Sequence, residues 1–275
     1  ELLNHHLFIT LSVIINSNTV LSNSEKKEII TEYCKLTDEQ QHGSNRITMI
    51  TPQPVTLTLE NLSDTKQPTI LQNYSVTEKA DGDRFLLYVN STGEAYLLNL
   101  TGVNKYNMKN YMNVIPCDVK FKKIRNSIVD GEFVTKNADG LSVKKFLFFD
   151  IYLYEKAGEN VFNYPFISDI PENSRLHYMI DFQNEYLDNC DKTTDSISID
   201  RKIYYHGTKK MDTTILKHAN NILKRAGEKG YDYTIDGLIF LPNNLSVKAD
   251  SPGEKLTNIS GTWPMNFKWK PVEEN

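Results

Sequence analysis

The chain has 275 residues, of which 39% are hydrophobic, and its fifteen Tyr and twelve Phe are enough to build a full core. This composition excludes a disordered chain. The formal net charge of -4 excludes a basic footprint for nucleic acid over the whole surface, so any site for a polyanion must be local.

The first fifty residues predict an N-terminal appendage, or a linker to an upstream domain, ahead of a main domain over residues 51–275. Its apolar run at residues 7–15 is too short to span a membrane, and it lacks the basic leader and cleavage site of a signal peptide. One or two strands are expected within residues 7–20. Ser22 and Glu25 have the spacing of a capping box, which predicts a helix through Leu36, followed by a loop over 37–46.

The main domain alternates β-rich runs with turn residues. The pattern predicts strands at residues 55–59, 74–77, 84–90, 95–100, 127–135 and 145–154. Turns are expected at residues 91–94 and 137–140, each of which contains a glycine. The lysine-rich stretch from Lys105 to Arg125 predicts a short helix and loops at the surface.

The last third of the chain predicts two helices and three strands. One helix is expected over residues 174–186. The other opens at Asp212, carries a regular apolar stripe and ends at Gly230. Strands are expected at residues 201–205, 234–241 and 266–270, with a polar loop at 243–261 before the last one.

The sequence Lys79-Ala80-Asp81-Gly82-Asp83-Arg84 lies between two of these strands. A lysine beside a tight turn is held by the backbone, as a nucleophile must be. At its reference pKa only about one lysine in 2,500 is neutral at pH 7, so such a nucleophile needs cationic neighbours. On its own, however, this motif more often marks a solvated lysine beside an ordinary turn.

Three acidic residues precede glycines within the β-rich runs: Asp81, Asp130 and Asp236. Each could mark a strand end, but together they suggest carboxylates gathered around lysines and a hard cation such as Mg²⁺ or Mn²⁺. Near the C-terminus, Lys268 and Lys270 fall on one face of a strand. Two parallel ammonium groups repel one another unless an anion lies between them, and a triphosphate is such an anion. On an edge strand, the same pair would simply be solvated.

Five segments, in this order, resemble the motifs of the covalent nucleotidyltransferases: KADGDR (79–84), VDGEFV (129–134), FLFFDIY (146–152), DGLIF (236–240) and FKWKP (267–271). This superfamily comprises the guanylyltransferases of mRNA-capping enzymes and the ATP-dependent polynucleotide ligases. Asp236 in the fourth motif and Trp269 with Pro271 in the fifth are similar to the capping branch, and the composition is similar to capping enzymes of large cytoplasmic DNA viruses. The resemblance implies an α+β, ATP-grasp-like fold of antiparallel sheets flanked by helices.

The resemblance also implies a role for each motif residue. Lys79 would attack the α-phosphate of GTP, and the resulting GMP would pass to RNA with a 5'-diphosphate end. The nucleotide-binding residues would be Glu78, Lys79, Arg84, Glu132, Phe149, Lys209, Lys268 and Lys270. Phe149 would stack on guanine, with Asp150 supporting the pocket, and Lys209 is a looser candidate for contacting the O6 atom of guanine. Asp236 would hold the catalytic metal, helped by Asp130.

Family members continue into an OB-fold domain after the fifth motif, and this chain stops about there. The sequence is therefore expected to be a piece of a larger capping polypeptide, located in the cytoplasm, whose other domains could include a triphosphatase and a methyltransferase. The three separated cysteines predict reduced thiols and neither a disulfide nor a zinc site. Two alternatives to the guanylyltransferase stay open: the adenylation domain of a DNA or RNA ligase, and a non-catalytic module that binds nucleotide or RNA.

Overall fold

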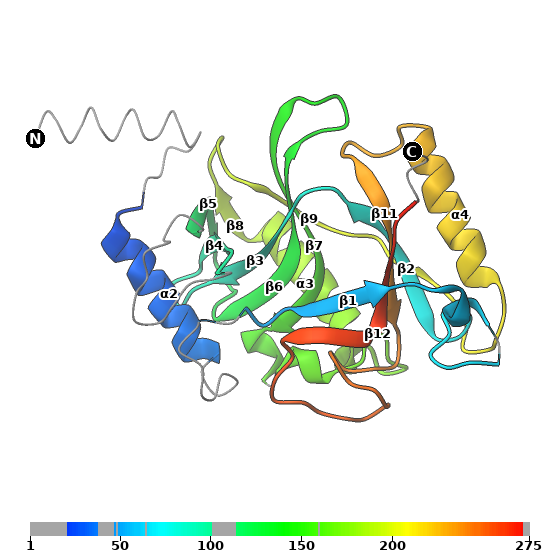
Figure 1. Ribbon diagram of the computed structural model, residues 1–275. Coiled ribbons are helices and arrows are strands. Elements are labelled where there is room, and N and C mark those ends of the chain that lie inside the picture. The colour runs from blue at the N-terminus through cyan, green and yellow to red at the C-terminus, as the bar shows by residue number, and fades with distance from the viewer. Residues whose placement is uncertain are drawn as a thin grey trace, which may run out of the picture.

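Two β-sheets make up the computed structural model of this chain, which describes residues 21–37, 47, 49–63, 65–100, 114–158 and 160–271 (Figure 1). Three α-helices flank the sheets, and the fold is therefore α+β, as the sequence predicts. The larger sheet has seven strands and the smaller has five. Most neighbouring strands are antiparallel; the parallel pairs are β1 with β12 and β7 with β9.

The seven-stranded sheet has the order β8-β5-β4-β3-β6-β7-β9. Its central strands are buried on both faces because helices and loops cover them. Phe148, Ile151 and Val129 are fully buried within one large apolar cluster. The strands are β3 (Asp83–Val89), β4 (Glu94–Leu98), β5 (Val114–Phe121), β6 (Ser127–Lys136), β7 (Ser142–Leu153), β8 (Cys190–Lys192) and β9 (Ser198–Arg201).

The five-stranded sheet has the order β1-β12-β11-β2-β10. Its own apolar cluster includes Val76, Phe240 and Phe267 and is closed on one side by the long helix α4 (Thr214–Gly227). Helix α4 lies beside β2 (Figure 1), and its apolar residues Ile215, Ala219 and Ile222 are buried in this cluster. The strands are β1 (Pro52–Thr56), β2 (Tyr74–Ala80), β10 (Tyr205–His206), β11 (Ile235–Pro242) and β12 (Gly261–Trp269).

The other two helices pack with the seven-stranded sheet. Helix α3 (Arg175–Asp188) lies against β7 and β9, and the hydroxyl of Ser174 caps its N-terminus by accepting a hydrogen bond from the backbone of His177. Helix α2 (Asn23–Thr37) inserts the fully buried Tyr33 next to Tyr88 of β3, with ring centroids 6.0 Å apart. Both helices therefore contribute to the core of the larger sheet.

The expected capping box is present at the start of α2. The Ser22 amide donates to Glu25 Oε2 at 2.6 Å, and the Glu25 amide donates to Ser22 Oγ at 3.2 Å. The strands expected within residues 7–20 and most of the loop expected over 37–46 lie outside the described residues. Although α2 shares the main core, the division of the chain near residue 50 stays a prediction.

Several elements differ from those predicted. Residues 114–121 form the strand β5, where the lysine-rich stretch had suggested a helix and loops. The predicted strand at 201–205 is wrong, because β9 ends at Arg201 and β10 begins at Tyr205. Strand β1 begins earlier than expected, at Pro52. Helix α4 ends at Gly227, and Gly230 instead closes the following turn by donating its amide to the Arg225 carbonyl.

The chain passes between the two sheets at two short connections. Residues 81–82 join β2 of the smaller sheet to β3 of the larger, and residues 202–204 lead back from β9 to β10. The first connection is the Asp-Gly turn of the lysine motif. Both connections are therefore at the junction where a cavity opens between the sheets. None of the helices in the described ranges has the length and hydropathy required to cross a membrane.

Candidate active site

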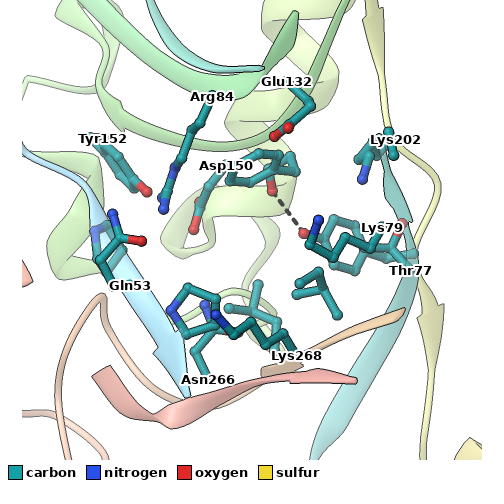
Figure 2. Close-up of a pocket in the computed structure, with 17 residues that line it drawn as sticks. Gln53, Thr77, Lys79, Arg84, Glu132, Asp150, Tyr152, Lys202, Asn266 and Lys268 are labelled. Carbon is teal, nitrogen blue, oxygen red and sulfur yellow. Dashed lines mark hydrogen bonds between the residues drawn. The ribbon is translucent and has the colours of Figure 1, made fainter. Parts of the chain in front are cut away.

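A cavity of about 220 Å³ lies between the two sheets, and its walls come from both (Figure 2). The labelled side chains project from the strands toward the shared space. Six residues of the predicted site line it: Lys79, Arg84, Glu132, Phe149, Asp150 and Lys268. The fold thus brings together residues that are up to 189 positions apart (79 to 268).

Lys79 and Asp236 form an ion pair at one side of the cavity. The Lys79 Nζ atom is 2.8 Å from Oδ1 and 3.1 Å from Oδ2 of Asp236. The ammonium group of Lys270 is 2.6 Å from Asp236 Oδ2, so one carboxylate lies between two lysines. Burial raises the pKa of Asp236, but the hydrogen bonds from Lys270 and Lys79 outweigh this and hold its pKa below the ordinary value.

Gly237 explains how Asp236 reaches this position. Gly237 lies opposite Lys79 in the pairing of β11 with β2, next to a register shift. Its φ of +152° is a backbone conformation that favours glycine, and a Cβ atom at this position would lie 2.0 Å from the Trp269 carbonyl oxygen. The Asp-Gly pair therefore lets β12 approach β11 closely, while the bulge directs the carboxylate toward Lys79.

Arg84 is held in the cavity by Asp130 from the neighbouring strand β6. The Nε atom donates to Asp130 Oδ1 at 3.0 Å, and Nη2 donates to Oδ2 at 2.5 Å. Tyr152 adds a hydrogen bond from its hydroxyl to Oδ2 at 2.5 Å. Burial lowers the pKa of the Arg84 guanidinium, but the carboxylate of Asp130 raises it by more, so the group is held fully charged.

The same contacts are relevant to the prediction that Asp130 helps to hold a metal ion. Its side chain is wholly inaccessible to solvent, and both carboxylate oxygens already accept hydrogen bonds from Arg84 or Tyr152. It is also absent from the residues that line the cavity. This geometry suits a residue that orients Arg84 and gives no support to a contact between Asp130 and a metal ion.

Two cations lie near the ring of Phe149. The guanidinium of Arg84 is 5.4 Å from the centre of its ring, and the ammonium of Lys202 is 5.8 Å away. The hydroxyl of Tyr204 donates to the Phe149 carbonyl oxygen at 2.9 Å, the hydrogen bond that is dashed in Figure 2. The ring is therefore fixed at a place where a planar aromatic ligand could stack on it.

Lys202 is the most deeply buried cation of the cavity, with 3% of its side chain exposed. Its Nζ atom donates to the carbonyl oxygen of Glu78 at 2.6 Å and is 3.8 Å from the Glu78 carboxylate. Burial lowers the pKa of Lys202, and the carboxylates of Glu78 and Glu132 oppose this. The result is a hydrogen-bond donor held against the backbone of β2, one residue from Lys79.

Two further carboxylates face the cavity. Burial raises the pKa of Glu132 above its ordinary value, and Lys202, Lys79 and Arg84 offset this in part. Burial likewise raises the pKa of Asp150, which accepts a hydrogen bond from Arg175 Nε at 2.8 Å. Arg175 also donates to the carbonyl oxygens of Tyr164 and Leu245, and so anchors Asp150 to α3.

The protein by itself offers few ligands to a metal ion. In the part of the chain that the structure describes, no three His, Cys, Asp or Glu side chains are grouped closely enough to hold one. Asp236 is accessible, with 24% of its side chain exposed, and lies beside the candidate nucleophile. Mg²⁺ commonly binds through one or two carboxylates together with substrate phosphates and water, and this donor set is compatible with Asp236.

The structure places two predicted residues away from the cavity. Lys209 is at the surface, with 77% of its side chain exposed, and pairs with Asp169 at 2.8 Å. The side chain of Glu78 projects from the face of β2 opposite Lys79, where its carboxylate accepts a hydrogen bond from Tyr233 at 2.9 Å. Glu78 acts on the site through Lys202, by accepting a hydrogen bond at its carbonyl oxygen and by the charge of its nearby carboxylate.

Several cavity residues were absent from the prediction: Gln53, Thr77, Lys202, Tyr204, Asn266 and Tyr152. Tyr152 and Asn266 each lie two residues from a predicted site residue along a strand, Asp150 and Lys268 respectively, so strand alternation alone could have found them. Lys202 gave no such signal. It follows Asp200 and Arg201 directly, and its burial depends on Glu78, which is 124 residues earlier in the chain.

Curated relatives support a family assignment. The chain is 25% identical to a probable mRNA-capping enzyme of Acanthamoeba polyphaga mimivirus over 311 residues, which cover 99% of this chain and 24% of the relative. It is 23% identical to an mRNA-capping enzyme of Danio rerio over 225 residues, which cover 81% of this chain and 32% of that protein. The chain thus spans between about a quarter and a third of the length of these relatives.

Solved structures with a similar arrangement include a mycobacterial DNA ligase D complexed with ATP and MES, with 13% identity, a TM-score of 0.41, and coverage of 80% of this chain and 60% of that one. The family model of the mRNA capping enzyme catalytic domain matches residues 13–271, which is nearly the whole chain and includes every cavity residue described above. This chain belongs to the family of mRNA capping enzyme catalytic domains.

Proposed function

We propose that this domain is an mRNA guanylyltransferase that transfers GMP from GTP, through a covalent bond to Lys79, to the 5'-diphosphate end of RNA. The observation that carries the proposal is the position of Lys79. Its amine lies at the side of a cavity that also presents a fixed aromatic ring and the phosphate-binding candidate Lys268. Membership of the capping enzyme family supports GTP and RNA as the substrates.

In the first step, the Nζ atom of Lys79 attacks the α-phosphorus of GTP. The amine attacks in its neutral form: a nitrogen–phosphorus bond forms, the bond from the α-phosphorus to the oxygen that bridges it to the β-phosphorus breaks, and pyrophosphate leaves with that electron pair. The proton that the nitrogen gives up is taken up by the departing pyrophosphate. Lys268 and Lys270 supply positive charge where the phosphates gain negative charge. Asp236, with its pKa held low, is a poor proton acceptor, and its role is to orient Lys79.

In the second step, a terminal oxygen of the RNA diphosphate attacks the same phosphorus. The nitrogen–phosphorus bond breaks, its electron pair returns to the Lys79 nitrogen, and that nitrogen takes up a proton from water, which regenerates the free amine. A Mg²⁺ or Mn²⁺ ion held by Asp236 would supply further charge neutralisation on the phosphate oxygens. The protein's own contribution is to hold the amine, the phosphates and the base in a fixed relation.

For the nucleoside, we propose that guanine stacks on Phe149 and that Lys202 donates a hydrogen bond to its O6 atom. Lys202 replaces Lys209 in this role because it is buried in the cavity and lies 5.8 Å from the Phe149 ring centre, whereas Lys209 is exposed and paired with Asp169. Arg84, oriented by Asp130, and Glu132 would hold the ribose hydroxyls. Further domains of a longer capping polypeptide and a cytoplasmic location stay predictions.

The test uses GTP labelled at the α-phosphate and, separately, ATP labelled in the same way, each with Mg²⁺, followed by denaturing electrophoresis. We expect GTP to label the wild-type chain and to leave a Lys79→Ala variant unlabelled. Labelling by ATP in place of GTP would instead identify the adenylation domain of a ligase. Binding of GTP without any label in the presence of Mg²⁺ or Mn²⁺ would support a non-catalytic nucleotide-binding module.

A further inference from the structure

One segment of the chain is strongly basic, although the chain as a whole is acidic. Residues 201–231 carry eight Lys or Arg and only two acidic residues, Asp212 and Glu228, whereas the formal net charge of the whole chain is -4. Helix α4, which this segment contains, has no acidic residue. A basic stripe along one helix is the electrostatic footprint of a nucleic-acid surface, but the same run on its own could be a solvated face. The contacts around α4 decide between the two interpretations.

The basic side chains of α4 lie on the face that points away from the smaller sheet. Its apolar residues are buried against that sheet, whereas Lys217, Lys224 and Arg225 are exposed. The ammonium of Lys224 is 3.9 Å from the Glu228 carboxylate, but the two side chains are 71% and 66% exposed, so water screens the pair and the lysine stays available. Helix α4 therefore presents cations that a phosphate backbone can reach.

A second cavity, of about 350 Å³, opens beside the C-terminal end of α4. The residues that line it include Arg201, Tyr205, Arg225, Tyr231 and Tyr233. The rings of Tyr231 and Tyr233 have centroids 5.7 Å apart, and the guanidinium of Arg225 lies 4.5 Å from the centre of the Tyr231 ring. Aromatic rings beside arginines are typical of surfaces that bind single-stranded nucleic acid, because bases stack on the rings and phosphates pair with the cations.

Arg201 enters this second cavity without a counter-charge. The side chain is partly buried, and its Nη1 atom donates to the carbonyl oxygen of Lys202 at 3.3 Å. Among the residues that the structure describes, no carboxylate forms an ion pair with it, and burial lowers its pKa. Arg84 and Arg175, by contrast, each pair with an aspartate. A partly buried cation without a partner is unfavourable, so an anionic ligand would stabilise Arg201.

The carboxylates of the second cavity do not supply that counter-charge, because each has partners of its own. Asp200 and Asp232 both form ion pairs with Lys145. Glu78 accepts a hydrogen bond from the hydroxyl of Tyr233 at 2.9 Å. The two arginines of the second cavity therefore stay available to phosphates.

The second cavity is close to the nucleophile, on the opposite face of β2. Lys79 lines the active-site cavity and its neighbour Glu78 lines the second one, as the alternation of side chains along a strand requires. Tyr233 precedes Asp236 by three residues, so their Cα atoms are at most about 11 Å apart. Because Asp236 is accessible to solvent, an RNA strand whose 5' end reaches Lys79 can pass the start of β11 and continue into the second cavity and along α4.

We propose that the outer face of α4 and the second cavity together bind the single-stranded part of the acceptor RNA, a few nucleotides from its 5' end. This RNA surface consists of Lys217, Lys224, Arg225, Arg201 and Tyr231: the four cations pair with phosphates, and the tyrosine stacks on a base. The inference rests on the proposed function, because it takes RNA with a 5'-diphosphate as the acceptor. Such contacts suit any base, so we expect little sequence preference.

The probe is a fluorescently labelled oligouridylate of about twelve nucleotides, a length within the site sizes of proteins that bind single strands. Its 5' end is a hydroxyl, so it cannot accept GMP. We expect the double variant Lys217→Gln with Lys224→Gln to weaken binding in fluorescence anisotropy. It should also reduce the slope of log affinity against log salt by roughly 1.4, because each phosphate contact on a single strand contributes about 0.7.

Two further variants test the second cavity. Arg201→Met should weaken binding of the probe roughly tenfold, the scale of one lost hydrogen bond to a charged group. Tyr231→Leu should weaken binding without changing the salt slope, because stacking releases no counterions. Circular dichroism checks that both variants fold, and the exposed pair Lys217 and Lys224 keeps the proposal testable if one of them does not.

Lys27→Gln with Lys35→Gln is the matched control, because it removes two exposed lysines from α2, which lies across the molecule from α4 in Figure 1. It should leave the affinity and the salt slope close to those of the wild type. Equal effects of the two double variants would overturn the proposal, since net charge alone would then explain binding. So would complete displacement of the probe by GTP at concentrations that just saturate GTP binding, because this would place the RNA in the active-site cavity.

RNA binding is measured without transfer, so the two proposals can fail separately. If the probe binds as described but GTP never labels Lys79, guanylyl transfer fails and the RNA surface stands. If GTP labels Lys79 but Lys217→Gln with Lys224→Gln binds the probe like the wild type, only the RNA surface fails. A wild-type chain that does not bind the probe also overturns the RNA surface and leaves the labelling test unaffected.

Discussion

Arg84 of β3 and Asp130 of β6 lie diagonally on adjacent strands, since Arg84 is opposite Glu132 and Asp130 is opposite Leu86, and they form a two-pronged ion pair with distances of 3.0 Å and 2.5 Å. Asp130 is wholly buried, whereas 23% of the Arg84 side chain stays accessible. The buried carboxylate of Asp130 therefore holds the Arg84 guanidinium in a fixed orientation at the cavity. Asp130 is the support, and Arg84 is the member of the pair that a ligand can reach.

We expect Asp130→Asn to lower the free energy of unfolding by about 3 kcal/mol, since it leaves a partly buried cation without its counter-charge. It should also weaken GTP binding, because Arg84 loses its orientation. Tyr152→Phe removes the second hydrogen bond to Asp130 and should cost about 1 kcal/mol. Urea unfolding and calorimetry measure the two effects. GTP affinity that is unchanged in Asp130→Asn would show that Arg84 does not depend on this carboxylate.

Lys202 and Lys209 allow a paired test of the proposed contact with O6. The nucleotide probe is 2-aminopurine riboside triphosphate, which keeps the 2-amino group of GTP and lacks O6. Lys202→Met should remove a preference of roughly tenfold for GTP over this analogue, whereas Lys209→Met should leave it intact. The ratio of affinities is the useful measurement, because loss of Lys202 also leaves Glu78 buried without its cation. The reverse result would restore Lys209 as the base contact.

Gly237 should not tolerate a side chain. In Gly237→Ala the new Cβ atom would meet the Trp269 carbonyl oxygen at 2.0 Å, and the φ of +152° is rarely adopted by alanine. We expect a loss of about 2 kcal/mol or more in the free energy of unfolding, with a loss of GTP labelling as Asp236 shifts. Gly227→Ala at the end of α4 meets no atom within 4 Å and should change neither quantity appreciably.

The lowered pKa of Asp236 predicts how its contribution to stability depends on pH. A carboxyl group whose pKa is lower in the folded protein stabilises the fold above its unfolded pKa, which is about 3.9, and this contribution is lost as the pH falls through the folded pKa. The difference in unfolding free energy between the wild type and Asp236→Asn should therefore be greatest near neutral pH and shrink below about pH 4. A difference that is constant or grows on acidification would contradict this assignment.

The sequence predicted the structure correctly where short-range sequence signals agree with the fold. The capping box at Ser22 and Glu25, the turns at 91–94 and 137–140, and the stripe of α4 are all local, and the structure confirms these elements. Strand β5 was missed because Pro116 and Asp118 interrupt its alternation. Asp118 has a φ of 53°, an irregularity that sheet pairing tolerates and that a pattern of apolar residues does not predict.

The motifs located the nucleophile and its ion pair better than they located Lys202 and Asn266. Lys79, Asp236 and Lys270 come together because each sits in a short motif with its own backbone geometry. Lys202 and Asn266 owe their positions to long-range pairing, with Glu78 and with the bulge against β1. Whether these side chains are buried depends on how the two sheets assemble, so the residues next to them in the sequence do not indicate it.

The two connections between the sheets, residues 81–82 and 202–204, determine which sheet can form first. Strands β3 to β9 come from one continuous segment, residues 83–201, whereas the five-stranded sheet needs β1 and β2 from before it and β10 to β12 from after it. The larger sheet can form while the rest is still being synthesised, but the smaller one must wait for β12. Pulsed hydrogen exchange during refolding should protect the amides of β6 and β7 before those of β2 and β11, so Lys79 would meet Asp236 and Lys270 only in the last stage.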